Sequence, residues 1–180
     1  MYKRQAQPCG GAARVAARLG GPAGGPLCDV PLAPLQGSVG LRRQTDGRTA
    51  VAAVVPLGRL SAAQAELLAD LAASVEVTPH RTVVVPDLPD ESAAVLLAAA
   101  GLVPDPGSPW TRVTACAGRP GCAKSLADVR ADVTTAIATG SLPAGGARQH
   151  WAGCARRCGR PQGGVVDVVA TPAGYLIEKD

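Results

Sequence analysis

The stretch V-G-L-R-R-Q-T-D-G-R-T-A-V-A-A-V-V, residues 39–55, decides the fold of the first half of the chain. It holds two runs that suit β-strands, 39–43 and 49–55, separated by Thr-Asp-Gly-Arg at 45–48. An Asp-Gly pair between such runs is a strong hairpin signal, because the turn needs a backbone with positive φ. The stretch therefore predicts an antiparallel β-hairpin at the start of an ordered domain.

The residues after the hairpin begin with a helix signal. Ser61-Ala-Ala-Gln64 has the pattern of a capping box and predicts a helix that runs to about residue 73. Runs at 75–78 and 81–85 then suit strands on either side of Pro79. Four leucines are expected to form the buried stripe of the helix: Leu60, Leu67, Leu68 and Leu71.

A second helix is expected after the last of these strands. Asp90 is predicted to cap it and Gly101 to end it. The resulting order, ββαβα, predicts an α+β unit whose helices cover one face of its sheet. Three apolar residues are expected on the helix: Val95, Leu96 and Leu97.

The last third of the chain carries two pairs of cysteines, in Cys116-Ala-Gly-Arg-Pro-Gly-Cys122 and Cys154-Ala-Arg-Arg-Cys158. A [4Fe–4S] cluster needs four thiolates from loops that reach it from different sides. A gap of five suits neither a structural zinc ribbon, which prefers two to four, nor the C-x2-C-x2-C run of bacterial ferredoxins. The spacing predicts a [4Fe–4S] cluster on these four cysteines, with a zinc site and buried or disulfide-bonded thiols as alternatives.

The residues around the cysteines predict a helix and a hairpin. Ser125-Leu-Ala-Asp128 is a capping signature, and the helix that it opens is expected to end at Gly140. The positive end of that helix would lie near the thiolates and favour an anionic cluster. Runs at 165–169 and 175–177 predict a closing hairpin. The buried face of the helix is expected to contain Leu126, Val129, Val133 and Ile137.

Several of these segments resemble a known superfamily. Residues 113–123 and 150–161, which contain the cysteines, resemble the cluster-binding signature of the nitrite and sulfite reductase superfamily, and within it that of the precorrin-3B synthases. Residues 37–60 and 77–85 are similar to the ferredoxin-like half domain of the same superfamily. The resemblance covers about residues 37–180. It implies an α+β fold with one ferredoxin-like half domain (ββαβα) at 37–104 and a [4Fe–4S]-binding α/β segment at 105–180.

The resemblance implies an oxidoreductase. A precorrin-3B synthase hydroxylates precorrin-3A with molecular oxygen and forms a lactone, in aerobic cobalamin biosynthesis. The first alternative is a fragment of a siroheme-dependent nitrite or sulfite reductase, in which Cys158 would bridge the cluster and the siroheme iron. The second is a non-catalytic iron–sulfur electron-transfer module or a zinc-bound interaction domain. Siroheme is expected only under the first alternative.

The resemblance also implies partners. A precorrin substrate carries acetate and propionate groups, which guanidinium groups bind well, and the cluster needs an electron donor. Complete relatives have two half domains, so we expect this chain to be a C-terminal half that works with an N-terminal half domain. No catalytic residue is assigned, and His150 is considered only as a group near Cys154. The candidate substrate-binding residues are Arg43, Arg81, Lys124 and Arg157.

Composition sets limits on the other classes of function. Residues 1–36 are rich in Gly and Pro and predict a flexible tail in which Cys9 and Cys28 are free thiols. The six cysteines come without a signal peptide or a long apolar run, which favours a cytoplasmic enzyme with no membrane segment. The net charge of +4 is modest and its basic residues are scattered, so nucleic acid is not an expected partner.

Overall fold

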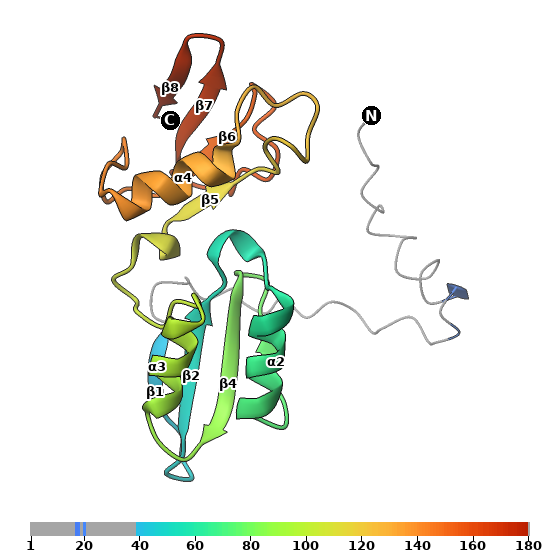
Figure 1. Cartoon of the computed structure of the whole chain (residues 1–180), viewed down its shortest axis with the longest axis vertical. Helices are drawn as coiled ribbons and strands as arrows, with labels where there is room; N and C mark the ends of the chain where they lie inside the picture. Colours follow the sequence, from blue (N-terminus) through green and yellow to red (C-terminus); the bar gives the residue numbers. More distant parts are fainter. Residues whose placement is uncertain (1–16, 19, 21–38, 180) are drawn as a thin grey trace. The chain divides into compact units, whose positions relative to one another are not determined.

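A computed structural model of the chain describes residues 17, 18, 20 and 39–179. The tail predicted at residues 1–36, with Cys9 and Cys28, lies outside the described residues apart from 17, 18 and 20. Leu35–Asp180 form one compact unit, and two four-stranded sheets lie within it (Figure 1).

The hairpin predicted at the start of this unit is confirmed. β1 (Gly40–Arg43) and β2 (Thr49–Val54) pair in antiparallel fashion. Gly47 has φ of 86° in the turn, a conformation that glycine adopts without steric cost. The Asp46 carboxylate accepts a hydrogen bond from the backbone N–H of Arg48 at 3.0 Å, which closes the turn and fixes the register of the two strands.

Two further strands complete the first sheet, whose order is β1-β2-β4-β3. β4 (Thr82–Leu88) pairs with β2, and the two-residue β3 (Glu76–Val77) pairs with the other edge of β4. β4 continues past the predicted end of its run, through Pro86. The pairing with β2 shifts register at that point, so that proline, which donates no hydrogen bond, is accommodated at an irregularity. The observed element order is ββαββα.

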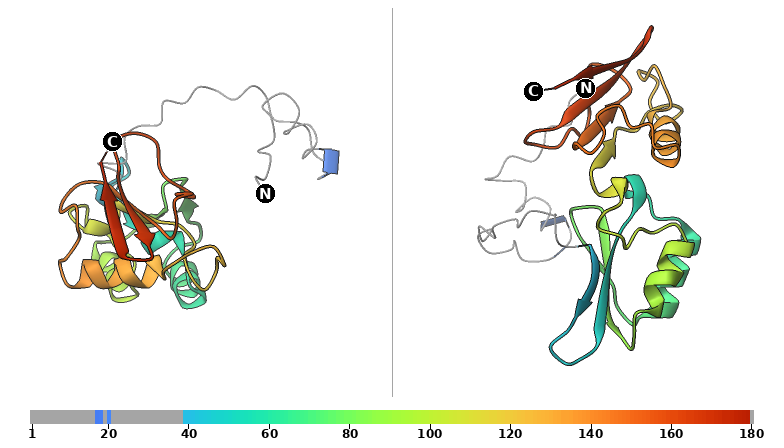
Figure 2. Two further views of the ribbon diagram at one scale, coloured as in Figure 1. Left: turned by 90° about the horizontal axis from the view of Figure 1, so that it is seen from above. Right: turned by 90° about the vertical axis from the view of Figure 1, so that its left-hand side faces the viewer.

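Both helices of this part lie on one face of the sheet, as predicted (Figure 2). α2 (Ala62–Leu71) starts with the expected capping box, in which the side chains of Ser61 and Gln64 each accept a hydrogen bond from the other residue's backbone N–H. The amide of Gln64 also donates to the carbonyl of Ala100 at 2.9 Å. The cap of α2 is thereby tied to the end of α3 (Ser92–Ala99).

The predicted apolar faces of these helices are only partly correct. Leu68 and Leu97 are fully buried, whereas Leu60, Val95 and Leu96 are exposed. The cause lies in composition, because α3 reads S-A-A-V-L-L-A-A and is apolar on every side, so its sequence does not reveal its buried face. The core between sheet and helices consists of Val51, Ala53, Val55, Leu68, Val83, Val85, Leu88, Ala93, Leu97 and Leu102.

Asp90 holds the start of α3 in a way that differs slightly from the prediction. Glu91 occupies the cap position, without a side-chain hydrogen bond to the helix. The carboxylate of Asp90 accepts a hydrogen bond from the backbone N–H of Ser92 at 2.8 Å. Asp90 therefore satisfies the backbone N–H of Ser92 near the helix start, although it stands one position before the cap residue. Gly101 follows the helix with φ of 83°, as its predicted role requires.

The second sheet has the order β5-β6-β7-β8. β5 (Val113–Ala115), β6 (Gln149–Ala152) and β7 (Val166–Thr171) are parallel, while β8 (Gly174–Glu178) returns antiparallel to β7. The β7–β8 hairpin confirms the predicted closing hairpin. β5 and β6 were not predicted, because three- and four-residue strands carry no measurable periodicity.

α4 (Val129–Ala138) connects β5 to β6 and packs against the second sheet. It begins later than predicted: Asp128, not Ser125, is the cap and accepts a hydrogen bond from the backbone N–H of Ala131 at 3.1 Å. Leu126 consequently lies outside the helix and is exposed. The second core consists of Val113, Val129, Val133, Ala136, Trp151, Val168 and Ala170.

Specific contacts join the two sheets. Leu57, in the short 3-10 turn after β2, packs against the second core. The guanidinium of Arg81 donates to the carbonyl of Val113 at 2.8 Å, at the start of β5. Among the helices of the described residues, none has the length and apolar character needed to cross a bilayer.

Candidate cysteine-ligand site

The two cysteine motifs leave neighbouring parallel strands at the same edge of the second sheet. β5 and β6 pair in parallel with Ala115 opposite Trp151. Cys116 follows β5 directly, and its backbone N–H donates to the carbonyl of Trp151 at 2.9 Å. Cys154 follows β6 two residues after its end. Because carboxyl ends of parallel strands meet at one edge, the fold brings together two loops that are far apart in the sequence.

Direct contacts join the two loops. The backbone N–H of Gly153 donates to Sγ of Cys116 at 3.2 Å. The carbonyl of the same glycine accepts from the backbone N–H of Leu126 at 2.8 Å. Hydrogen bonds to cysteine sulfur stabilise negative charge on it and tune the potential of iron–sulfur clusters. Gly153 therefore links the first motif, the segment after it and the second motif.

Gly153 is a position where only glycine fits. A Cβ built there would lie 1.8 Å from Oγ and 2.8 Å from Cβ of Ser125, which is buried. The Ser125 hydroxyl is itself engaged, since it donates to the carbonyl of Ala127 at 2.7 Å. Gly153 was not among the residues predicted to form the site. Its signal was a glycine directly before the first cysteine of a pair.

The first cysteine loop is closed by its own hydrogen bonds. The backbone N–H of Cys122 donates to the carbonyl of Gly118 at 2.8 Å, and the carbonyl of Cys122 accepts from the backbone N–H of Ser125. Gly118 has φ of 64°, and a Cβ there would lie 2.9 Å from the side chain of Val129. The loop is therefore packed tightly against the first residue of α4.

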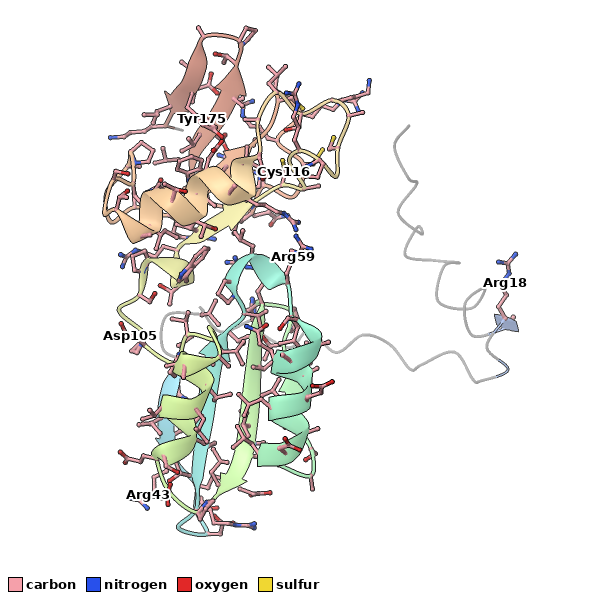
Figure 3. The ribbon with its side chains drawn as sticks, in the orientation of Figure 1. Arg18, Arg43, Arg59, Asp105, Cys116 and Tyr175 are labelled. Atoms are coloured by element: carbon pink, nitrogen blue, oxygen red, sulfur yellow. The ribbon has the colours of Figure 1, made fainter. Side chains whose placement is uncertain are left out.

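The N-terminal turn of α4 contacts the cysteine loop, in agreement with the predicted proximity. Arg119 donates through its backbone N–H to the carbonyl of Ala127 at 3.0 Å. Arg130, in the first turn, donates through Nε to the carbonyl of Cys116 at 3.1 Å. Figure 3 shows Cys116 beside this end of the helix. The helix thus supplies one guanidinium and its positive end to the same region.

The four predicted ligands are free thiols, with Cys116, Cys122 and Cys154 half-buried and Cys158 exposed. Among residues 39–179, no three Cys, His, Asp or Glu side chains are close enough together to hold a metal ion. The residue types and the contact between the loops suit a four-thiolate ligand set.

Two of the candidate substrate-binding residues lie at opposite ends of the first sheet. Arg43 pairs with Thr49 at the hairpin turn and donates to the carbonyl of Gly47 at 3.1 Å (Figure 3). Arg81 lies at the other end, where its carbonyl accepts from the backbone N–H of Val55. Burial lowers the pKa of Arg81, and repulsion from Arg148 adds to the effect. Only Arg81 of the two reaches the strand that leads into the cysteines.

The other two candidates lie in the cysteine segments. Lys124 is exposed and stands two residues after Cys122. Arg157 stands directly before Cys158, and its guanidinium forms ion pairs with Asp167, at 3.1 Å, and with Glu178. The structure therefore places Lys124 in solvent and Arg157 among carboxylates.

His150 is fully buried on β6. Its Nδ1 shares a hydrogen bond of 2.8 Å with the hydroxyl of Thr114. Burial lowers the pKa of His150, an effect that the carboxylate of Asp167 and the backbone of Cys158 oppose. The imidazole is therefore a neutral, hydrogen-bonded group inside the second sheet. The backbone of Cys158, in the second cysteine motif, lies next to the imidazole.

Comparisons with known proteins bear on both parts of the chain. Residues 42–102 match the family described as the nitrite/sulfite reductase ferredoxin-like half domain. Among solved structures, the chain is similar to the Mycobacterium tuberculosis NirA protein, with a TM-score of 0.57 and 24% sequence identity. That similarity covers 78% of this chain and 30% of the NirA chain. A search of the curated proteins finds no match.

The chain therefore carries a nitrite/sulfite reductase ferredoxin-like half domain, built from the first sheet and its two helices. The similarity in fold to NirA extends over more of the chain than the matched half domain. Proteins of the nitrite/sulfite reductase family are oxidoreductases. The chain spans about a third of the length of the similar solved structure.

Proposed function

We propose that this chain is the cluster-binding part of an oxidoreductase related to nitrite and sulfite reductases. The ligands of its [4Fe–4S] cluster would be Cys116, Cys122, Cys154 and Cys158. One observation carries the proposal: two cysteine motifs leave adjacent parallel strands and are joined by the hydrogen bond from Gly153 to the Cys116 sulfur. A purely structural pair of loops does not require four cysteines at this edge.

The residues of the chain have defined tasks in this proposal. When bound, the cluster would supply electron transfer. The N–H of Gly153 lowers the energy of negative charge on the Cys116 sulfur. The positive end of α4 adds a favourable interaction energy of a few tenths to about 1 kcal/mol with that charge. Half-burial of three of the thiols limits their exposure to water.

The specific reaction that we propose is that of precorrin-3B synthase. Its support is the resemblance of both cysteine segments to those of that enzyme, alongside the similarity of residues 37–60 and 77–85 to the half domain of the superfamily. Arg81, which contacts β5, and Lys124, which stands two residues after Cys122, are the basic candidates near the first cysteine motif. They suit the carboxylates of a tetrapyrrole. Arg43 lies at the opposite end of the first sheet, so it would have to contact a different part of the substrate or a partner protein.

A second candidate function is supported by the match of the chain to a half domain that is named for nitrite and sulfite reductases. In this case the chain would be part of a siroheme-dependent nitrite or sulfite reductase. Both candidates share the four cysteines and need a second half domain. They differ in the role of the tetrapyrrole macrocycle. It is the substrate in the first case and a bound siroheme cofactor in the second.

Genetic complementation tests the choice. The chain is produced with the N-terminal half domain of a complete precorrin-3B synthase in a cobalamin auxotroph that lacks the oxygen-dependent synthase. We expect growth without added cobalamin, and no growth when the chain is produced alone. A matched strain carrying Cys154→Ser in the same pair should not grow.

Two outcomes would overturn the specific reaction. Rescue of a nitrite or sulfite reductase mutant, together with a siroheme absorption spectrum, would select the second candidate. Failure of both rescues by a pair that binds its cluster would show a non-catalytic electron-transfer module.

A further inference from the structure

A buried carboxylate, that of Asp167, pairs with arginines of the second cysteine segment. Asp167 is the second residue of β7, and only 4% of its surface is exposed. It stands opposite His150 of β6 in the parallel register. Because an ionised carboxylate is strongly disfavoured in an apolar sheet unless it is paired, its partners reveal what it holds in place.

Both partners are arginines from the second cysteine segment. Nε of Arg160 lies 3.0 Å from Oδ1 and 2.9 Å from Oδ2 of Asp167. Nε of Arg157 lies 3.1 Å from Oδ2, although its direction does not meet the geometry of a hydrogen bond. Arg160 also donates to the carbonyl of Val165, and Arg157 bonds to the carboxylate of Glu178. One buried carboxylate therefore receives two cations from the same loop.

The two arginines lie on either side of Cys158 in the sequence. The backbone N–H of Arg157 donates to the carbonyl of Cys154, and that of Arg160 donates to the carbonyl of Arg157. Arg157 has φ of 47°, a left-handed conformation that is unfavourable for a residue with a side chain. Such a conformation persists only where surrounding contacts hold it. The ion pairs of Arg157 with Asp167 and Glu178 are contacts of that kind.

We propose that Asp167 is a positioning residue for the second cysteine motif. Through Arg157 and Arg160 it anchors the loop from Cys154 to Arg160 on β7 and fixes the positions of both cysteines relative to the second sheet. This inference deepens the proposed function and rests on it for the cluster, while the anchoring itself concerns the polypeptide alone. It also gives Arg157 a task other than substrate binding.

The sequence contained a signal for this residue. Asp167 interrupts the apolar run V-V-D-V-V at 165–169, and two arginines precede it within ten residues. A lone acidic residue in a buried strand indicates a paired cation, and the nearest cations flank Cys158. The run itself predicted only a strand of the closing hairpin.

The test uses Asp167→Asn, which keeps the shape of the side chain and removes its charge. In metal-free protein we expect trypsin cleavage after Arg156 and Arg157, and maleimide labelling of Cys154, to accelerate about tenfold or more, because losing one partner leaves buried cations uncompensated. Cleavage after Arg48 in the first sheet should keep its wild-type rate. Glu178→Gln, which removes the half-exposed partner of Arg157 alone, should give a much smaller increase.

Reconstituted protein gives the second readout. We expect Asp167→Asn to lose iron to a chelator about tenfold faster than wild type, with Glu178→Gln close to wild type. If Asp167→Asn does not fold, Arg160→Gln should show the same local acceleration, because it removes the arginine that contacts both carboxylate oxygens.

The outcomes separate the two claims. Unchanged cleavage and labelling in the metal-free variant, or a uniform increase at Arg48 and at every cysteine, would overturn the anchoring role. Local acceleration in a protein that binds no iron even as wild type would leave the anchoring intact and refute the cluster.

Discussion

Replacing Cys154 by serine is expected to abolish cluster assembly, with bound iron falling from about four per chain to below one. The ligand of an iron–sulfur cluster is a thiolate, and a serine hydroxyl stays protonated at neutral pH and binds iron far more weakly. Cys154 is half-buried and contributes little to either apolar core. The variant should therefore unfold at nearly the same urea concentration as wild type.

The matched control is Cys28→Ser, which changes the same chemical group in the predicted tail. It should bind iron as wild type does, with the same broad visible absorbance. Equal iron in Cys154→Ser and wild type would remove Cys154 from the ligand set. An equal loss of iron in Cys28→Ser would show that the ligands are not those proposed.

The second large effect is expected from Gly153→Ala. The added methyl group would overlap Oγ of Ser125 and approach its Cβ and Cα to 2.8 and 3.3 Å. Rotation of the serine side chain relieves only the first of these contacts, so the backbone of one loop has to move. We expect a loss of about 1–3 kcal/mol or more in the free energy of unfolding, measured by urea denaturation of metal-free protein.

A control and a partial rescue are available for this prediction. Gly121→Ala adds the same methyl group in the first loop, where the nearest atom lies 3.7 Å away, and should change stability little. Ser125→Gly removes both side-chain contacts and should recover part of the stability in the double variant. A stable Gly153→Ala without the second change would contradict the close approach of the two loops.

The local features of the fold were predictable because their causes are local. The Asp46-Gly47 turn and the Ser61–Gln64 capping box each depend on residues within a few positions of one another. The same holds for the β7–β8 hairpin. In each case the sequence contains both partners of the hydrogen bonds that define the element.

The parallel part of the second sheet depends on distant partners. Ala115 and Trp151 are paired across the whole of α4 and its loops, and nothing in either three- or four-residue strand specifies the other. The start of α4 was placed too early because Ser125 fits a capping signature, whereas its hydroxyl is used within the loop. A capping pattern shows that a residue is able to cap, and tertiary contacts decide whether it does.

In the candidate site, too, local features were predictable from the sequence, whereas contacts between distant segments were not. The cysteine spacing identified the four candidate ligands, and the sheet topology explains why the two motifs meet. The four-cysteine ligand set itself stays a prediction. Gly153 and Asp167 act through contacts with Ser125 and with two arginines, which become visible only when the loops are placed.

The most direct test of the central claim is the metal content of the purified chain after anaerobic reconstitution with iron and sulfide. Iron and acid-labile sulfide are counted per chain, and the dithionite-reduced protein is examined by electron paramagnetic resonance. The proposal predicts about four irons and four sulfides per chain, with the signal of a reduced [4Fe–4S] cluster. One zinc per chain with no bound iron, or no metal at all, would contradict it.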